Sequence, residues 1–167
     1  MLNRCLKVVA PAFVFLLVLT ACSTGSPVDV NNELWKGTSQ SRGGNGTTLT
    51  ATVGFKQTGN EVRAKWAFNR PGSLDIIFIP TMTGTISGSA INISSTDSVG
   101  DSGTFQGRFD GSGQSLTGTL TISTSATQLV IDINATYDQP LRDNALVNPQ
   151  SNVRSQGFDG SFRKLLE

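Results

Sequence analysis

The stretch at residues 48–68, TLTATVGFKQTGNEVRAKWAF, decides the fold of this chain. It holds two runs in which every second residue is apolar, separated by the turn-forming residues Thr58, Gly59 and Asn60. The apolar positions are Leu49, Ala51, Val53 and Phe55 in the first run and Val62, Ala64, Trp66 and Phe68 in the second. Successive side chains point to opposite faces of a strand, so this stretch predicts an antiparallel hairpin with one buried face and one solvated face.

The same pattern continues towards the C-terminus. Strand-like runs cover residues 83–87, 90–94, 105–109, 116–122 and 129–137, with Gly-rich or Ser-rich turns between most of them. About eight to ten short strands, with turns about 8–12 residues apart, are typical of an antiparallel meander. Closing such a sheet on itself removes its exposed edges. The predicted fold class is therefore all-β, an antiparallel meander that closes into a small barrel or forms a strongly curved sandwich.

The end of the chain breaks the strand pattern and then resumes it. Residues 140–152 contain two prolines and no alternation, whereas Phe158 and Phe162 flank an Asp-Gly turn signal. We interpret this last segment as a short strand that pairs with the first strand near Trp35 and closes the barrel.

Composition restricts the function. The chain has 167 residues, a formal net charge of +1 and no histidine. The length fits one domain, and the small charge argues against a nucleic-acid-binding surface. Without histidine, a Ser-His-Asp triad and a histidine metal site are excluded. We therefore expect a non-enzymatic protein with no cofactor, no metal and no nucleic-acid partner.

The first residues have the pattern of an export signal. Arg4 and Lys7 precede an apolar run at residues 8–19, which is short for a membrane-spanning helix. The run ends in Leu19-Thr20-Ala21-Cys22, which resembles the lipobox of bacterial lipoproteins. The resemblance implies cleavage before Cys22 and attachment of acyl chains such as palmitate to this residue. The alternative is an ordinary signal peptide that leaves Cys22 as a free thiol.

This interpretation divides the chain into three parts. Residues 1–21 form a lipoprotein signal peptide, residues 22–32 a polar and flexible tether, and residues 33–167 a single β-barrel-like domain. Because two or more acyl chains hold a protein stably at a bilayer, we expect a cell-envelope protein anchored to the membrane through Cys22. Ser23 follows the cysteine, and by analogy with Gram-negative lipoproteins this favours the outer membrane.

Aromatic side chains at inward positions are candidates for a ligand cavity. They are Trp35, Trp66, Phe68, Phe105, Phe109 and Tyr137. Apolar walls with a few polar groups are typical of small-molecule sites, although the same side chains can equally fill the barrel as core. The strand pattern resembles the lipocalin and avidin group of small barrels, but Trp35-Lys36-Gly37 reverses the Gly-x-Trp order of lipocalins. The resemblance transfers no ligand residue, so the expectation of a small hydrophobic ligand rests on these aromatic side chains.

A second candidate surface lies at residues 74–80. If Ile76 and Phe78 face inward, Ile77 and Ile79 project outward and break the polar outer pattern. Such a strip is a candidate docking site for an envelope protein, in which case the protein acts as a structural or assembly factor. The alternative is that Leu141, Leu146 and Val147 of the C-terminal segment cover it.

Asp97, Asp101 and Asp110 lie among Gly and Ser, where oxygen-rich loops can hold Ca²⁺ or a carboxylate pair can cleave glycosides. Their spacing matches no known calcium loop, and Asp residues are frequent in tight turns. We therefore expect neither a metal site nor a hydrolase.

Overall fold

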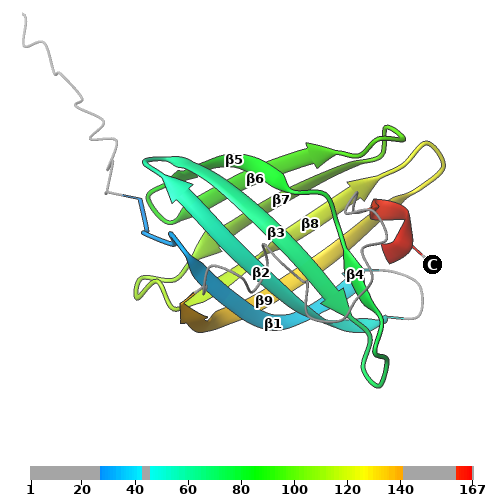
Figure 1. Cartoon of the computed structure of the whole chain (residues 1–167), viewed down its shortest axis with the longest axis horizontal. Coiled ribbons are helices and arrows are strands. Elements are labelled where there is room, and N and C mark those ends of the chain that lie inside the picture. The colour runs from blue at the N-terminus through cyan, green and yellow to red at the C-terminus, as the bar shows by residue number, and fades with distance from the viewer. Residues whose placement is uncertain (1–26, 43–45, 141–160, 167) are drawn as a thin grey trace, which may run out of the picture.

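The computed structural model describes residues 27–42, 46–140 and 161–166 (Figure 1). Within these residues the chain forms nine β-strands and one short 3₁₀ helix. The strands are β1 (Glu33–Arg42), β2 (Thr48–Thr58), β3 (Glu61–Asn69), β4 (Ile76–Phe78), β5 (Met82–Ser87), β6 (Ala90–Thr96), β7 (Ser102–Phe109), β8 (Ser115–Ser123) and β9 (Gln128–Pro140), and the helix is η1 (Phe162–Leu165). The predicted antiparallel meander is confirmed.

The sheet closes into a barrel because β1 pairs with both β2 and β9. The β1–β9 ladder runs from the pair Glu33 and Pro140 to the pair Arg42 and Val130, and all strand pairs in the described part of the chain are antiparallel. Strands β4 and β5 both pair with β3, at opposite halves of it, so they share one place in the wall. The result is an eight-position barrel whose fourth position is interrupted around Pro80, a residue that cannot donate a ladder hydrogen bond.

The prediction that a C-terminal strand closes the barrel is wrong for residues 161–166. The strand that meets β1 is β9, and residues 161–166 carry a 3₁₀ helix, while residues 158–160 lie outside the described part of the chain. Side chains three residues apart lie above one another in a 3₁₀ helix. Phe162 and Leu165 have this spacing and are both buried, so the apolar pair suits a helical cap better than a strand.

The inward side chains of the alternating strands fill the interior of the barrel. The core combines the inward residues of every strand, and its largest fully buried side chains include Trp35, Trp66, Phe55, Phe68 and Phe105. An eight-stranded barrel encloses a space that side chains can fill or that holds one small ligand. Here aromatic rings occupy that space.

Two glycines make room for one of these rings. Gly107 on β7 lies directly opposite Gly118 on β8. A Cβ atom built on Gly118 stands 2.6 Å from Cζ of Phe105 and 2.5 Å from the carbonyl oxygen of Gln106. The ring of Phe105 therefore lies where side chains at these two positions would otherwise stand.

Different segments cover the two ends of the barrel (Figure 1). At one end, the backbone N–H of Val28 donates to the carbonyl of Gly88, and Val30 is fully buried. Val28 and Val30, which belong to the segment assigned from the sequence to a tether, both pack against the core at this end. At the other end lies η1, shown in red. None of the helices in the described residues is long and apolar enough to cross a membrane.

Candidate functional site

The aromatic side chains predicted to line a cavity lie together inside the barrel. Trp35, Trp66, Phe68, Phe105 and Phe109 are at most 1% exposed, and Tyr137 is half-buried against the same core. Four strands contribute them, namely β1, β3, β7 and β9, and all six side chains point to the inside of the barrel or its edge. The structure thus brings the whole predicted set into one cluster.

The cluster has two halves joined by one phenylalanine. In the first half, the ring of Trp35 lies 5.2 Å from Phe109 and 6.2 Å from Tyr137, measured between ring centroids. In the second half, Trp66 lies 5.0 Å from Phe105 and stacks on Phe68 at 6.0 Å. Ring pairs at these distances stabilise a core beyond the area they bury.

Phe55 bridges the halves, with its ring 6.5 Å from each tryptophan ring. The sequence analysis placed Phe55 on the buried face of the first hairpin but not among the site residues. Its position directly across the β2–β3 ladder from Ala64, a small residue, was the signal that a large ring has room there.

The two tryptophans bury hydrogen-bond donors that have no acceptor. Neither Trp35 Nε1 nor Trp66 Nε1 has a hydrogen-bond partner among the described residues, although both side chains are fully buried. A buried donor without a partner destabilises the native state by about 1–3 kcal/mol, and such groups are uncommon in native proteins. A hydrogen-bond acceptor that enters the core would therefore be stabilised by a hydrogen bond from either indole N–H.

The two donors differ in their surroundings. Burial raises the pKa of Glu33, whereas interaction with the Trp35 indole lowers it. The Glu33 carboxylate is thus near the Trp35 N–H, outside the geometry of a full hydrogen bond. No comparable group of the described residues is recorded at Trp66, so Trp66 Nε1 is the stronger candidate to bind an acceptor from outside the chain.

The predicted partner surface at Ile77 and Ile79 is wrong. Phe68 of β3 is directly opposite Ile77, and residues opposite one another in a ladder share a face. Because Phe68 faces the core, Ile77 does too, and the side chains of Ile77 and Ile79 are 9% and 5% exposed. The outward residue is Ile76, which is 52% exposed. Leu141, Leu146 and Val147, proposed as a cover, lie outside the described residues.

The three aspartates considered for calcium do not converge. Asp97 and Asp101 lie in the loop between β6 and β7, whereas Asp110 lies in the turn after β7, at the opposite end of that strand. Asp101 pairs with Arg163, and the Asp110 carboxylate accepts from the backbone N–H groups of Gln114 and Ser115. Among the described residues, no three His, Cys, Asp or Glu side chains lie close enough together to hold a metal ion.

A depression lies on the outer face of the wall, on the opposite side of Gly107 and Gly118 from the ring of Phe105. It has a volume of about 510 Å³, and Gly107 and Gly118 form part of its floor. Its outward side chains are those of Gln106, Arg108, Thr117, Thr119 and Asp132. Arg42 forms a bidentate ion pair with Asp132 and lowers the pKa of that carboxyl. Sequence reasoning missed this depression, because it depends on which strands become neighbours.

Cys22 lies outside the described residues, so its lipidation remains a prediction from the sequence. The chain matches no protein-family model, no curated protein and no solved structure at a significant level. The interpretation of its function therefore rests on its own residues.

Proposed function

We propose that this chain is a lipid-anchored cell-envelope protein whose barrel binds one small apolar ligand and catalyses no reaction. The observation that carries the proposal is the aromatic interior with a buried, unpaired indole donor at Trp66. Apolar walls with a small number of polar groups are the usual composition of small-molecule sites. An eight-stranded barrel can hold one such molecule, and in this barrel the ligand would take the place of side chains that fill the interior.

Charge restricts the ligand further. Among the described residues, the polar or charged side chains that are buried are Ser39 and Asp101, and neither supplies a positive charge. An anion moved into such an interior loses its hydration without gaining a cation. The buried carboxylate of Asp101 is already paired with Arg163, so a cation gains no free partner there either, and we expect a neutral ligand.

The anchor in this proposal is Cys22, on the strength of the Leu19-Thr20-Ala21-Cys22 sequence. Acyl chains on its sulfur hold the protein at a membrane, the outer membrane if the source is Gram-negative. The first described residues lie at the end of the barrel opposite η1 (Figure 1). A protein held by its N-terminus thus has the η1 end of the barrel on its far side from the attachment.

Native mass spectrometry of the protein extracted from its own envelope tests the binding function. We expect a population heavier than the acylated chain by one small neutral molecule. If only the acylated chain is found, and no neutral apolar compound restores the heavier species, the binding function is wrong.

Metabolic labelling with radioactive palmitate tests the anchor separately. We expect label in the natural chain and none in Cys22→Ser, which should also leave the membrane fraction. A Cys5→Ser variant is the matched control, because this change leaves the lipobox intact, and it should retain the label. Equal labelling of the natural and Cys22→Ser chains would contradict the anchor.

A further inference from the structure

The η1 end of the barrel is closed by a separate element of the chain. Phe162 is fully buried and Leu165 is 8% exposed, although both belong to a helix of only four residues. Ser161 caps this helix by accepting a hydrogen bond from the backbone N–H of Arg163. The helix contributes no strand to the sheet, so the barrel's ladders do not depend on it.

Phe162 occupies a position shaped for it on β7. A Cβ atom built on Gly103 stands 2.5 Å from Cζ of the Phe162 ring, so the ring lies where a side chain at residue 103 would be. Gly103 and Phe105 are two residues apart and share the inward face of β7. Beyond Gly103 along that face, Phe105 contacts Trp66 at 5.0 Å. A series of packed apolar groups, Phe162, Gly103 and Phe105, thus connects the cap to the tryptophan with the unpaired donor.

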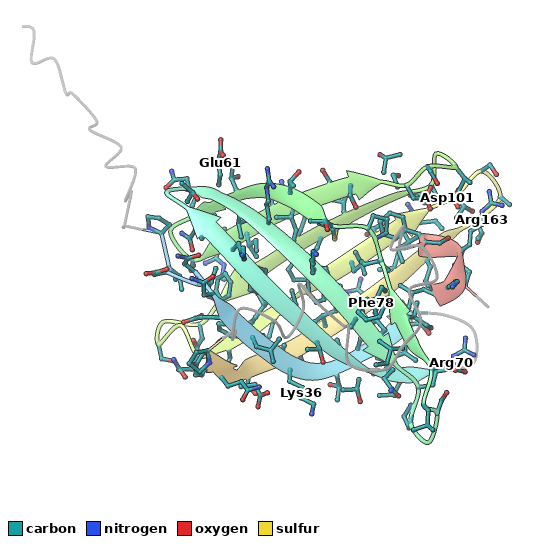
Figure 2. The ribbon with its side chains drawn as sticks, in the orientation of Figure 1. Lys36, Glu61, Arg70, Phe78, Asp101 and Arg163 are labelled. Atoms are coloured by element: carbon teal, nitrogen blue, oxygen red, sulfur yellow. The ribbon has the colours of Figure 1, made fainter. Side chains whose placement is uncertain are left out.

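One ion pair holds the cap in place. Arg163 Nε donates to Asp101 Oδ2 at 2.7 Å, and the side chain of Asp101 is 2% exposed whereas that of Arg163 is 55% exposed. Figure 2 shows both residues at the end of the barrel that η1 covers, with Glu61 at the other end. Because Arg163 is largely in water, its guanidinium stays solvated when the cap is released.

We propose that the cap occupies the entrance of the ligand site and that a neutral apolar molecule with one carbonyl acceptor displaces it. The apolar body of the ligand takes the place of Phe162 over Gly103, and its carbonyl oxygen accepts from Trp66 Nε1. This inference rests on the proposed function and names the entrance, the ligand class and the polar contact of that site.

Competition between cap and ligand predicts how affinity changes. A ligand that binds only the open form has an apparent affinity reduced by the fraction of molecules that are open. Removing the ring of Phe162 or the charge of Asp101 raises that fraction. If about a tenth of the molecules are open in the natural protein, either change strengthens binding up to about tenfold.

The test uses the full chain with Cys22→Ser and three fluorescent probes. Methyl parinarate is apolar with a carbonyl, diphenylhexatriene is a hydrocarbon of similar character, and parinarate is the anion. Trp35 and Trp66 are the two tryptophans of the sequence, so quenching of their emission by energy transfer reports binding of the probe to the domain. We expect methyl parinarate to bind best.

Two variants test the entrance. Phe162→Ala and Asp101→Asn should each strengthen methyl parinarate binding by up to about tenfold. Arg42→Gln is the matched control, because it breaks the other ion pair, on the outer wall, and should leave binding unchanged. If Phe162→Ala does not fold, Asp101→Asn, which preserves side-chain shape, carries the same prediction.

Trp66→Phe tests the polar contact. It should weaken methyl parinarate binding by about tenfold, the equivalent of one hydrogen bond, and leave diphenylhexatriene binding unchanged. Equal loss for both probes would overturn the hydrogen bond to the ligand and would indicate that Trp66 acts through packing alone.

Different results would contradict the entrance at the cap and the proposed binding function. If the natural barrel binds methyl parinarate and both entrance variants bind it with unchanged affinity, the entrance is wrong and the proposed function stands. If neither the natural barrel nor any variant binds any probe, the proposed function itself is overturned.

Discussion

Arg163 and Asp101 are 62 residues apart in the sequence, yet Arg163 Nε lies 2.7 Å from Asp101 Oδ2. This ion pair ties the C-terminal cap to the loop before β7, beside the buried ring of Phe162. The two partners are unequal, because the aspartate is buried and the arginine side chain is more than half exposed. Because of this difference, the two partners should contribute unequally to the stability of the folded protein.

Removal of the arginine should cost more stability than removal of the aspartate charge. Arg163→Gln leaves a buried carboxylate without its cation, whereas Asp101→Asn releases an arginine that water can solvate. We expect Arg163→Gln to destabilise the protein more than Asp101→Asn does. Urea unfolding followed by circular dichroism measures both, and an equal or reversed order would contradict the assigned burial.

The glycine at residue 118 should resist substitution. In Gly118→Ala the new Cβ stands 2.5–2.7 Å from Gln106 O, Phe105 Cζ and Gly107 Cα, so the sheet or the ring must move. Overpacking of this kind costs about 1–3 kcal/mol. Gly111→Ala is the matched control, since nothing lies within 4 Å of its Cβ position. Thermal melts in which both variants lose equal stability would argue against this packing.

A charge should destabilise the protein at Ile77 and have little effect on stability at the neighbouring Ile76. Ile77→Asp places a carboxylate in the core opposite Phe68 and should destabilise the protein by about 3 kcal/mol. Ile76→Asp changes an exposed side chain and should alter stability by less than about 0.5 kcal/mol. The comparison uses chemical unfolding, and a larger effect at residue 76 would restore the orientation expected from the sequence.

Asp110 should contribute stability that acid removes. The Ser112 hydroxyl and the backbone N–H of Gln114 hold the pKa of Asp110 below its ordinary value of 3.8. A carboxyl whose pKa is lower in the folded state stabilises the protein above the unfolded pKa, and this contribution disappears as pH falls through the folded pKa. Asp110→Ala should therefore lower Tm near neutral pH and lessen the fall of Tm below about pH 4.

In the same series of melts, Glu33 should affect the pH dependence of Tm in the opposite direction to Asp110. Burial raises its pKa above 4.5, so its contribution is greatest below the unfolded pKa and is lost as pH rises through the folded pKa. Glu33→Gln should raise Tm near neutral pH and change it little near about pH 4. Parallel behaviour of the two variants would contradict the assigned environments.

Local alternation predicted most of the wall of the barrel. The hairpin at residues 48–68 appears as β2 and β3, with Val53 opposite Trp66. Each inward residue can be identified without a partner strand, because one face of such a strand is polar and the other apolar. For the same reason the aromatic residues of the core were found from the sequence.

The alternating pattern cannot identify the inward face of a strand whose two faces are both apolar. In the run Ile76-Ile77-Phe78-Ile79 either parity is possible from the sequence, and the pairing of Ile77 with Phe68 decides it. The cap and the Arg163–Asp101 pair depend on contacts between distant residues, which no local pattern contains. The unpaired donor of Trp66 is likewise a property of the packed core, since the sequence shows the indole but not its neighbours.

The most direct test of the account is the indole N–H signal of Trp66. In a ¹H–¹⁵N spectrum the two tryptophans give two indole cross-peaks, which Trp35→Phe and Trp66→Phe assign. On titration with 2-nonanone, a neutral ketone with an apolar chain, the Trp66 peak should move downfield as its N–H gains an acceptor, with a smaller change at Trp35. Indole peaks that both stay in place up to the solubility limit of the ketone would contradict ligand binding inside this barrel.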